Sequence, residues 1–149
     1  VPLTNMSIVN NGTPAQLTRL VASYTKLTTI DVSHMLNLEY LNLEGNEDTT
    51  DILLPDPSTS ASGFPKKYLR YINLDGIKLE GDSLVDWMET QRVFTAPDAY
   101  DDGHILEVSL RAMSIGLSED AKIRLENIIK SWEDSGTNKH LILDYDYDL

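Results

Sequence analysis

Aspartates are the residues of this sequence whose grouping most resembles a chemical site. Asp98, Asp101 and Asp102 fall in one expected loop, and a second group stands at positions 144, 146 and 148. Carboxylate oxygens are the ligands that calcium prefers, but neither group has the roughly 12-residue spacing and closing glutamate of an EF-hand loop. Calcium binding is therefore an open alternative. We favour solvated charge here and expect no metal or other cofactor.

Residue patterns typical of catalysis are missing from the sequence. His34, His104 and His140 lack metal-ligand spacing, and there is no cysteine. The sequence has no P-loop, no dinucleotide-binding glycine pattern, no nucleophile elbow and no H-E-x-x-H motif. A carbohydrate-active enzyme would need two carboxylates about 5 to 10 Å apart across a pocket. We keep that as a less favoured alternative and expect no enzymatic activity.

The composition is that of an ordinary globular domain with a strong acidic excess. Among 149 residues, 24 Asp and Glu face 12 Lys and Arg, which gives a net charge of −12. Such a charge argues against nucleic acid as a partner, because phosphate contacts need clustered basic residues. No apolar run approaches the roughly 20 residues needed to span a membrane. Residues 1–4 also lack the charged-then-apolar start of a signal peptide, which fits an intracellular protein or a processed sequence.

The elements that would position any site are indicated by a repeated strand pattern. Residues 38–46 read L-x-x-L-x-L-x-x-N, which predicts a short strand with Leu41 and Leu43 on one face. Residues 69–76 repeat this segment with five of eight positions identical. Weaker copies of the frame start near residues 3, 105 and 138. The pattern therefore predicts about five similar strands.

Helices are expected in three of the four intervals between these strands. Thr13 as N-cap, with a proline and a glutamine following it, predicts a helix that reaches Tyr24. Asp82 or Ser83 is expected to cap a second helix, and Ser118 a third. The interval at 47–67 is rich in proline and small polar residues, so a long surface loop is expected there.

Residues 27–47 resemble one unit of the roughly 21-residue leucine-rich repeats common in surface proteins of Bacteroides-like bacteria. In those repeats, an outer L-T-x-L-D-V-S segment, here 27–33, alternates with the strand motif. The resemblance implies an α/β fold, namely a leucine-rich-repeat-like right-handed β–α solenoid of about five parallel strands with helices on the convex side. It would form a single domain over 1–149. A doubly wound α/β sheet is the alternative, but its longer apolar strands and glycine-rich turn are not evident.

The repeat frame predicts a binding face. Leucines of the frame face the core, so the residues between them face the concave surface. Lining up the units gives three rows of candidate binding residues: Tyr40, Tyr71 and Glu107; Asn42, Asn73 and Ser109; and Glu44, Asp75 and Arg111. The terminal units add Asn5 and His140, Ser7 and Ile142, and Val9 and Asp144 to these rows. Exposed tyrosine is typical of protein recognition, although tyrosine and asparagine ladders also simply stabilise neighbouring strands.

These patterns together predict a non-catalytic leucine-rich-repeat protein. We expect it to bind a protein or a host-surface ligand through the concave strand face. A structural or spacer module within a larger surface protein is the alternative. The resemblance also implies an extracytoplasmic or cell-surface location.

Overall fold

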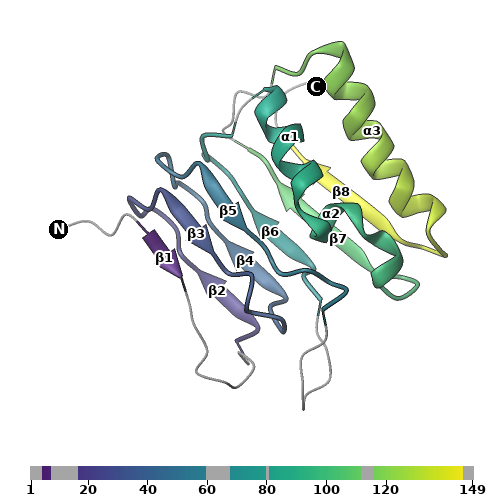
Figure 1. Ribbon diagram of the computed structural model, residues 1–149, viewed down its shortest axis with the longest axis horizontal. Helices are drawn as coiled ribbons and strands as arrows, with labels where there is room; N and C mark the ends of the chain where they lie inside the picture. The colour runs from purple at the N-terminus through teal and green to yellow at the C-terminus, as the bar shows by residue number, and fades with distance from the viewer. Residues whose placement is uncertain (1–4, 8–16, 60–67, 80, 112–115, 146–149) are drawn as a thin grey trace.

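The computed structural model of the chain describes residues 5–7, 17–59, 68–79, 81–111 and 116–145 (Figure 1). Within these ranges, short parallel strands form two sheets, and helices accompany the strands only in the second half of the sequence. Figure 1 shows the strands following one another across the molecule from β1 to β8, with the helices grouped near β7 and β8. The chain is therefore an α/β protein, as predicted.

The larger sheet has five strands, all parallel, in the order β2-β4-β6-β7-β8. Their bounds are β2 Arg19–Val21, β4 Tyr40–Asn42, β6 Tyr71–Asn73, β7 Ile105–Ser109 and β8 His140–Asp144. The neighbours β4 and β6 come from the two near-identical segments, so Leu41 pairs with Ile72. The sheet is open, with β2 and β8 at its edges. A five-stranded parallel sheet is therefore confirmed, with β4, β6, β7 and β8 near their predicted places and β2 instead of the strand predicted near residue 3.

The smaller sheet has three parallel strands in the order β1-β3-β5. These strands are β1 Asn5–Ser7, β3 Thr29–Asp31 and β5 Asp51–Leu53. Along the sequence the chain alternates between the two sheets, from β1 to β2, β3, β4, β5 and β6. Because Ile30 and Ile52 are paired and buried, this sheet closes the core on the side opposite β4 and β6.

Helices follow β6 and β7 where the earlier units have strands of the smaller sheet. They are α1 Asp82–Thr90, α2 Arg92–Thr95, the 3-10 helix η1 Pro97–Ala99, and α3 Glu119–Asp134. The change from strand to helix would leave one edge of β5 unpaired. Trp87 Nε1 donates to the Ile52 carbonyl at 2.9 Å, and Gln91 Oε1 accepts from the Leu54 amide at 3.0 Å. Two side chains thus provide hydrogen-bond partners for backbone groups at that edge, which would otherwise have no neighbouring strand to pair with.

The core lies between the larger sheet and the layer formed by the smaller sheet and the helices. Alternate residues of the larger sheet point into it, among them Leu41, Ile72 and Val108. From the other layer come Ile30, Ile52, Leu84, Val85, Met88, Phe94, Leu125 and Trp132. Since successive side chains of a strand point to opposite faces, the residues between the core positions lie on the other side of the larger sheet, which no helix or strand of the described part of the chain covers.

Each of the two best-matching strands ends in the same turn. Asn42 Oδ1 accepts from the Glu44 amide at 3.0 Å, and Asn73 Oδ1 accepts from the Asp75 amide at 2.8 Å. Such Asx turns reverse the chain direction with a side chain in place of a ladder bond. The two strands therefore stop at three residues each.

The prediction for the first unit was wrong. The strand expected near residue 3 is present as β1, but it pairs with β3 in the smaller sheet. A helix is predicted from Thr13 to Tyr24, but this range contains the strand β2, in which Leu20 pairs with Leu41. Thr13 itself lies outside the described residues. A capping signal predicts where a helix can begin, and here pairing with β4 outweighs local propensity.

Three further predictions can be compared with the structure. The loop predicted at 47–67 contains β5, although residues 60–67 lie outside the described ranges. Ser118 caps α3 as predicted, because its hydroxyl accepts from the Ala121 amide at 3.2 Å. Asp82 does not cap α1, whose N-cap is Gly81. The Asp82 carboxylate instead accepts hydrogen bonds from the Ser118 amide and hydroxyl, which links the starts of α1 and α3.

The register of the last strand also differs from the prediction. The frame starting at 138 would place His140 beside Glu107. In the structure His140 pairs with Ile105, while Ile142 pairs with Glu107 and Asp144 with Ser109. The shift is two residues, so the same side chains of β8 still face the core.

Candidate binding face

The uncovered side of the five-stranded sheet, which we call the open face, carries most of the predicted binding residues. It is formed by side chains from all five strands: Arg19, Val21, Tyr40, Asn42, Tyr71, Asn73, Ile105, Glu107, Ser109, His140, Ile142 and Asp144. Exposed hydrophobic side chains stand at both ends, with Val21 on β2 and Ile142 on β8. The face is thus neither uniformly polar nor uniformly apolar.

An aromatic ladder lies at the centre of the open face. The rings of Tyr40 and Tyr71 are stacked, with centroids 4.9 Å apart and planes 14° from parallel. The guanidinium of Arg19 lies over the Tyr40 ring, 3.8 Å from its centroid. Both faces of the Tyr40 ring are therefore occupied, one by a cation and one by a second ring. The prediction placed Tyr40 and Tyr71 side by side correctly, but it did not identify Arg19.

The second predicted row, Asn42, Asn73 and Ser109, forms hydrogen bonds within the chain that stabilise the fold. Asn42 and Asn73 use their carbonyl oxygens in the turns after their strands, and Asn73 is buried. Ser109 is also buried, and its hydroxyl donates to Asp75 Oδ1 at 2.6 Å. These three predicted binding residues lie next to one another, as expected, but their polar groups are largely engaged within the chain.

A row of charged residues follows the strands. Glu44 accepts a hydrogen bond from the Tyr24 hydroxyl at 3.1 Å. Asp75 accepts from the Arg111 amide at 2.7 Å, and the Arg111 guanidinium forms an ion pair with Asp144 at 3.1 Å. The three predicted residues of this row are therefore brought together at one edge of the open face. Each of them already has a partner within the chain.

Glu107 differs from these carboxylates. It pairs with Tyr71 across β6 and β7, and its side chain is exposed. None of the ion pairs or side-chain hydrogen bonds found among the described residues involves its carboxylate. Burial raises the pKa of the Tyr71 hydroxyl, with smaller contributions from Tyr40, Asp75 and Glu107. Among the described residues, Glu107 is thus a negative charge without a counter-ion, and it lies beside a neutral aromatic ring.

Two open-face neighbours were missed at the N-terminal end, Arg19 and Tyr24. A signal for them exists in the sequence, because residues 17–25 read L-x-x-L-x-A-x-x-T. This is a degenerate copy of the frame, placed 21 residues before Leu38. Its Thr25 stands at the asparagine position and donates its amide to Asn46 Oδ1 at 3.0 Å.

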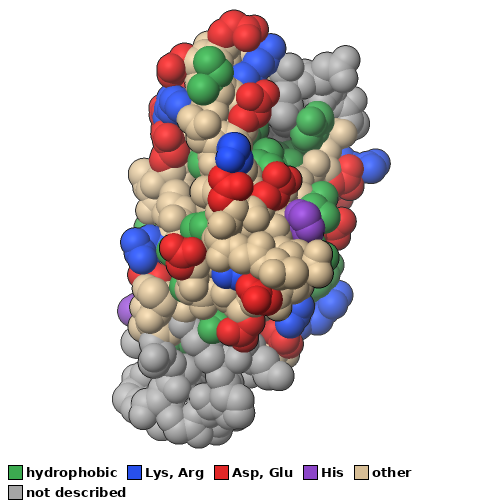
Figure 2. All heavy atoms as spheres, turned by 90° about the vertical axis from the view of Figure 1, so that its right-hand side faces the viewer, with side chains coloured by type: hydrophobic (Ala, Val, Ile, Leu, Met, Phe, Trp, Pro, Cys, Tyr) green, Lys and Arg blue, Asp and Glu red, His purple; other side chains and the backbone are tan. Residues whose placement is uncertain are grey.

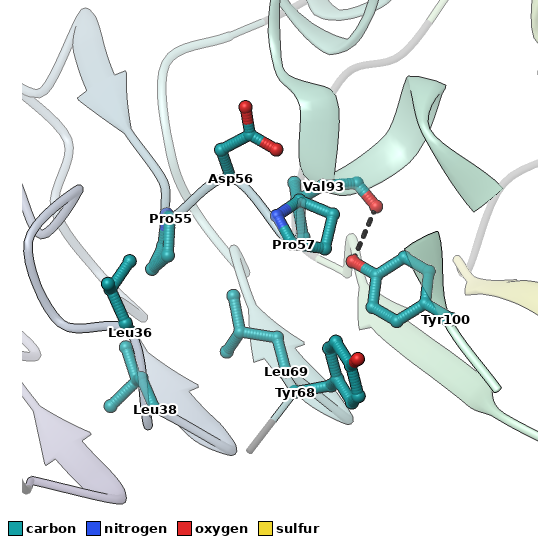
Figure 3. Close-up of a pocket in the computed structure, with 9 residues that line it drawn as sticks. All are labelled: Leu36, Leu38, Pro55, Asp56, Pro57, Tyr68, Leu69, Val93 and Tyr100. Carbon is teal, nitrogen blue, oxygen red and sulfur yellow. Dashed lines mark hydrogen bonds between the residues drawn. The ribbon is translucent and has the colours of Figure 1, made fainter. Parts of the chain in front are cut away.

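Two cavities lined by described residues lie away from the open face. Figure 3 shows the first, of about 10 Å³, which is lined by Leu36, Leu69 and Tyr100 among others. Its Asp56 carboxylate points away from the apolar side chains and forms an ion pair with Arg92 at 3.0 Å. That volume is about the room for one water molecule.

The second cavity is an open groove of about 370 Å³ between β5 and α1. Its walls include Leu53, Trp87, Gln91 and one carboxylate, Asp51. Neither of the two cavities joins the pair of carboxylates that a carbohydrate-active enzyme would need. The absence of enzymatic activity stays a prediction.

No group of three metal-ligating side chains is found among the described residues. Asp102 accepts from the Thr137 amide at 3.2 Å, and Asp144 pairs with Arg111; residues 146 and 148 lie outside the described ranges. Figure 2 shows the end of the molecule facing the viewer, where acidic side chains are spread over the surface with basic ones beside some of them. None of the described helices is long and apolar enough to cross a membrane.

The one buried histidine serves the core. His104 Nε2 donates to the Leu69 carbonyl at 2.8 Å, and its ring stacks on Tyr100 with centroids 4.5 Å apart. Burial lowers the pKa of His104. His34 and His140 are exposed. The amide of His140 donates to the His104 carbonyl at 3.2 Å, but no metal-ligating group of three forms around these histidines among the described residues.

Comparison with protein-family models, with curated proteins and with solved structures finds no match for this chain. The geometry of the open face is therefore the basis for any functional conclusion. That face combines a stacked tyrosine pair, exposed apolar residues at both ends and a carboxylate that has no counter-ion within the described ranges.

Proposed function

We propose that this chain is a leucine-rich-repeat-like β–α solenoid that binds another protein through the open face and catalyses no reaction. The proposal takes the alternation of strands between two parallel sheets as successive turns of one repeat. The helices after β6 and β7 would then be outer segments of longer turns. A cell-surface location and a host-surface ligand belong to the same proposal and rest on the sequence resemblance.

The observation that carries the proposal is the stacked pair Tyr40 and Tyr71 on the uncovered side of the sheet. Stacking against Arg19 and each other fixes both rings, so little rotamer freedom is left to lose when a partner binds. Tyrosine offers a large contact area and a hydroxyl at its tip, and it is enriched in protein-binding surfaces.

A structural role is the second candidate, and one observation favours it. Asn42, Asn73 and Asp75 direct their oxygens to groups within the chain. Ladders of this kind stabilise neighbouring strands whether or not a ligand binds. The two candidates differ in what they predict for Tyr40 and Tyr71: only the binding role predicts that removing these two side chains abolishes capture of a partner.

Capture of partners from bacterial and host-surface extracts tests the proposal. The immobilised chain is compared with the double variant Tyr40→Ala plus Tyr71→Ala and with Ile123→Ala plus Glu126→Ala. Ile123 and Glu126 are exposed on α3, so the second variant is a matched control. We expect a captured protein to be lost on the tyrosine variant alone, with circular dichroism showing an unchanged fold. Capture that both double variants retain would contradict binding through the open face.

A further inference from the structure

We infer that the open face binds an arginine side chain of its partner, seated between the ring of Tyr71 and the carboxylate of Glu107. The inference rests on the proposed protein-binding function and names the chemistry that this face would recognise. Its occupant is an exposed or extended segment of another protein that carries arginine.

The chain already places an arginine of its own on this ladder. Arg19, Tyr40 and Tyr71 occupy the same register position on β2, β4 and β6. Arg19 covers one face of the Tyr40 ring, and Tyr71 covers the other. The chain thus shows that this row has the spacing for a guanidinium to lie flat on a tyrosine ring.

The side of the Tyr71 ring that faces Glu107 is the place for a second guanidinium. The ring contacts found among the described residues place Tyr40 on one side of it, and the next side chain in the row is Glu107 on β7. In that part of the chain no aromatic or cationic group covers Tyr71 on the Glu107 side. A guanidinium placed there would repeat the contact that Arg19 makes with Tyr40.

The charges around this place also favour a cation. Arg19 on the open face is engaged with Tyr40, and Arg111 at its edge is engaged with Asp144. Glu107 has no counter-ion among the described residues. The net charge of the whole chain, −12, also attracts a basic segment over longer distances.

Arginine fits this position better than lysine. Its planar guanidinium stacks on an aromatic ring and at the same time presents a fork of N–H donors to a carboxylate, whereas an ammonium is a compact point charge. Tyr71 supplies the ring and Glu107 supplies the acceptor, on adjacent strands in direct register. Ile142, the exposed residue opposite Glu107 on β8, offers apolar surface to the aliphatic part of the same side chain.

Titration with short peptides tests the inference without a natural partner. The peptide Ser-Arg-Ser-Arg-Ser is compared with the version that carries neutral citrulline and with the version that carries glutamate. Backbone amide shifts of the 15N-labelled chain report the site and the dissociation constant. We expect saturable shifts at residues 71–73 and 107–109 with the arginine peptide. Citrulline keeps the planar shape but loses the charge, so its peptide should bind about tenfold more weakly.

Two variants separate the two halves of the site. Glu107→Gln removes the charge and Tyr71→Leu removes the ring, and each should weaken the arginine peptide about threefold. The matched control Glu126→Gln removes an equal charge from α3 and should leave binding unchanged. A well-dispersed spectrum shows that each variant is folded. Equal affinity for the arginine and citrulline peptides, or equal affinity in the wild type, Glu107→Gln and Tyr71→Leu, would overturn the inference.

The outcome is separable from that of the proposed function. A captured partner that is lost on Tyr40→Ala plus Tyr71→Ala but retained on Glu107→Gln would leave the binding face standing and overturn the arginine site. Arginine-dependent shifts at residues 71–73 and 107–109 that Glu107→Gln weakens would support the arginine site even if no extract yields a partner.

Discussion

The ring of Tyr24 lies directly over the backbone of Gly45, where a Cβ atom would be 2.4 Å from Tyr24 Cδ1. Tyr24 also holds a positive φ of 53°, as Gly45 does with a φ of 75°. The two residues stand at the same place after β2 and β4, since Tyr24 donates its amide to Glu44 and Gly45 donates to Asp75. Because the Tyr24 side chain lies over the turn after β4, position 45 in that turn requires glycine.

The first prediction concerns this contact. Gly45→Ala should destabilise the chain through a left-handed backbone, at about 1–2 kcal/mol, and through the clash, at about 1–3 kcal/mol more. Gly103→Ala is the matched control, because Gly103 has a φ of 82° and nothing within 4 Å of the added Cβ. Urea unfolding of both variants gives the two costs.

A double variant isolates the contribution of the ring. In a Tyr24→Gly background, Gly45→Ala should cost about as much as Gly103→Ala, because only the backbone term is left. A cost of Gly45→Ala that is the same with and without the Tyr24 ring would show that the contact is not limiting.

The second prediction concerns the edge of β5. Gln91→Met keeps the side-chain length but leaves the Leu54 amide without its acceptor. We expect a loss of about 1–3 kcal/mol, the cost of one unsatisfied buried group. Hydrogen exchange should show faster exchange at Leu54. The amide of Val32, which donates to Leu53 on the paired side of β5, serves as the internal control; equal acceleration at both amides would mean global destabilisation and contradict a local edge contact.

Much of the fold follows from the leucine pattern because one face of each strand is buried. The segments at 38–46 and 69–76 place apolar residues at the same positions, and parallel pairing of two such strands aligns Tyr40 with Tyr71 and Asn42 with Asn73. The centre of the open face was therefore predictable from the sequence. Its aromatic stack follows directly from that register.

The ends of the open face were not predictable in the same way. Residues 17–25 keep only two leucines of the frame, and the capping signal at Thr13 competes with them. At the other end, β8 keeps its alternation under a shift of two residues, so periodicity alone does not fix which residue lies beside Glu107. Arg19 and Ile142, the neighbours that complete the row, therefore emerge only from strand pairing.

The third prediction concerns pH. Burial lowers the pKa of His104 from its ordinary 6.5, so between the lowered value and 6.5 the unfolded chain binds a proton that the folded chain does not. The free energy of unfolding should therefore fall as pH falls below about 6.5. His104→Gln retains a donor for the Leu69 carbonyl and does not titrate, so it should reduce this slope. Denaturant unfolding at several pH values from 7.5 to 5 measures how the free energy of unfolding depends on pH.

The matched control for this measurement is His140→Gln, since His140 is exposed on β8. It should keep the slope of the wild type. A His104→Gln chain whose stability falls with pH as steeply as the wild type would assign the acid sensitivity to other groups.

The fourth prediction concerns the buried asparagine that ends the best-matching repeat. Asn46 Oδ1 accepts from the amide and the hydroxyl of Thr25, while Nδ2 donates to the carbonyls of Ala22 at 2.7 Å and Leu43 at 2.8 Å. It thus joins the turn after β2 to the turn after β4. Asn46→Ala would remove all of these hydrogen bonds from a side chain that has no solvent exposure, and we expect a loss of about 3 kcal/mol.

Asn37 provides the comparison, because it is also buried but its Oδ1 has no hydrogen-bond partner among the described residues. Asn37→Ala should cost about 1 kcal/mol. Urea unfolding compares the two variants, and equal costs would contradict a linking role for Asn46. The next unit has Ile77 at the equivalent position, where it is buried and forms no side-chain hydrogen bonds. Asn46→Ile therefore also removes the hydrogen bonds of Asn46, but it fills the site with a larger apolar side chain. If β2 needs the polar link to stay on the sheet, hydrogen exchange at Ala22 and Tyr24, whose amides donate to β4 and Glu44, should accelerate in both Asn46 variants before the rest of the sheet is affected.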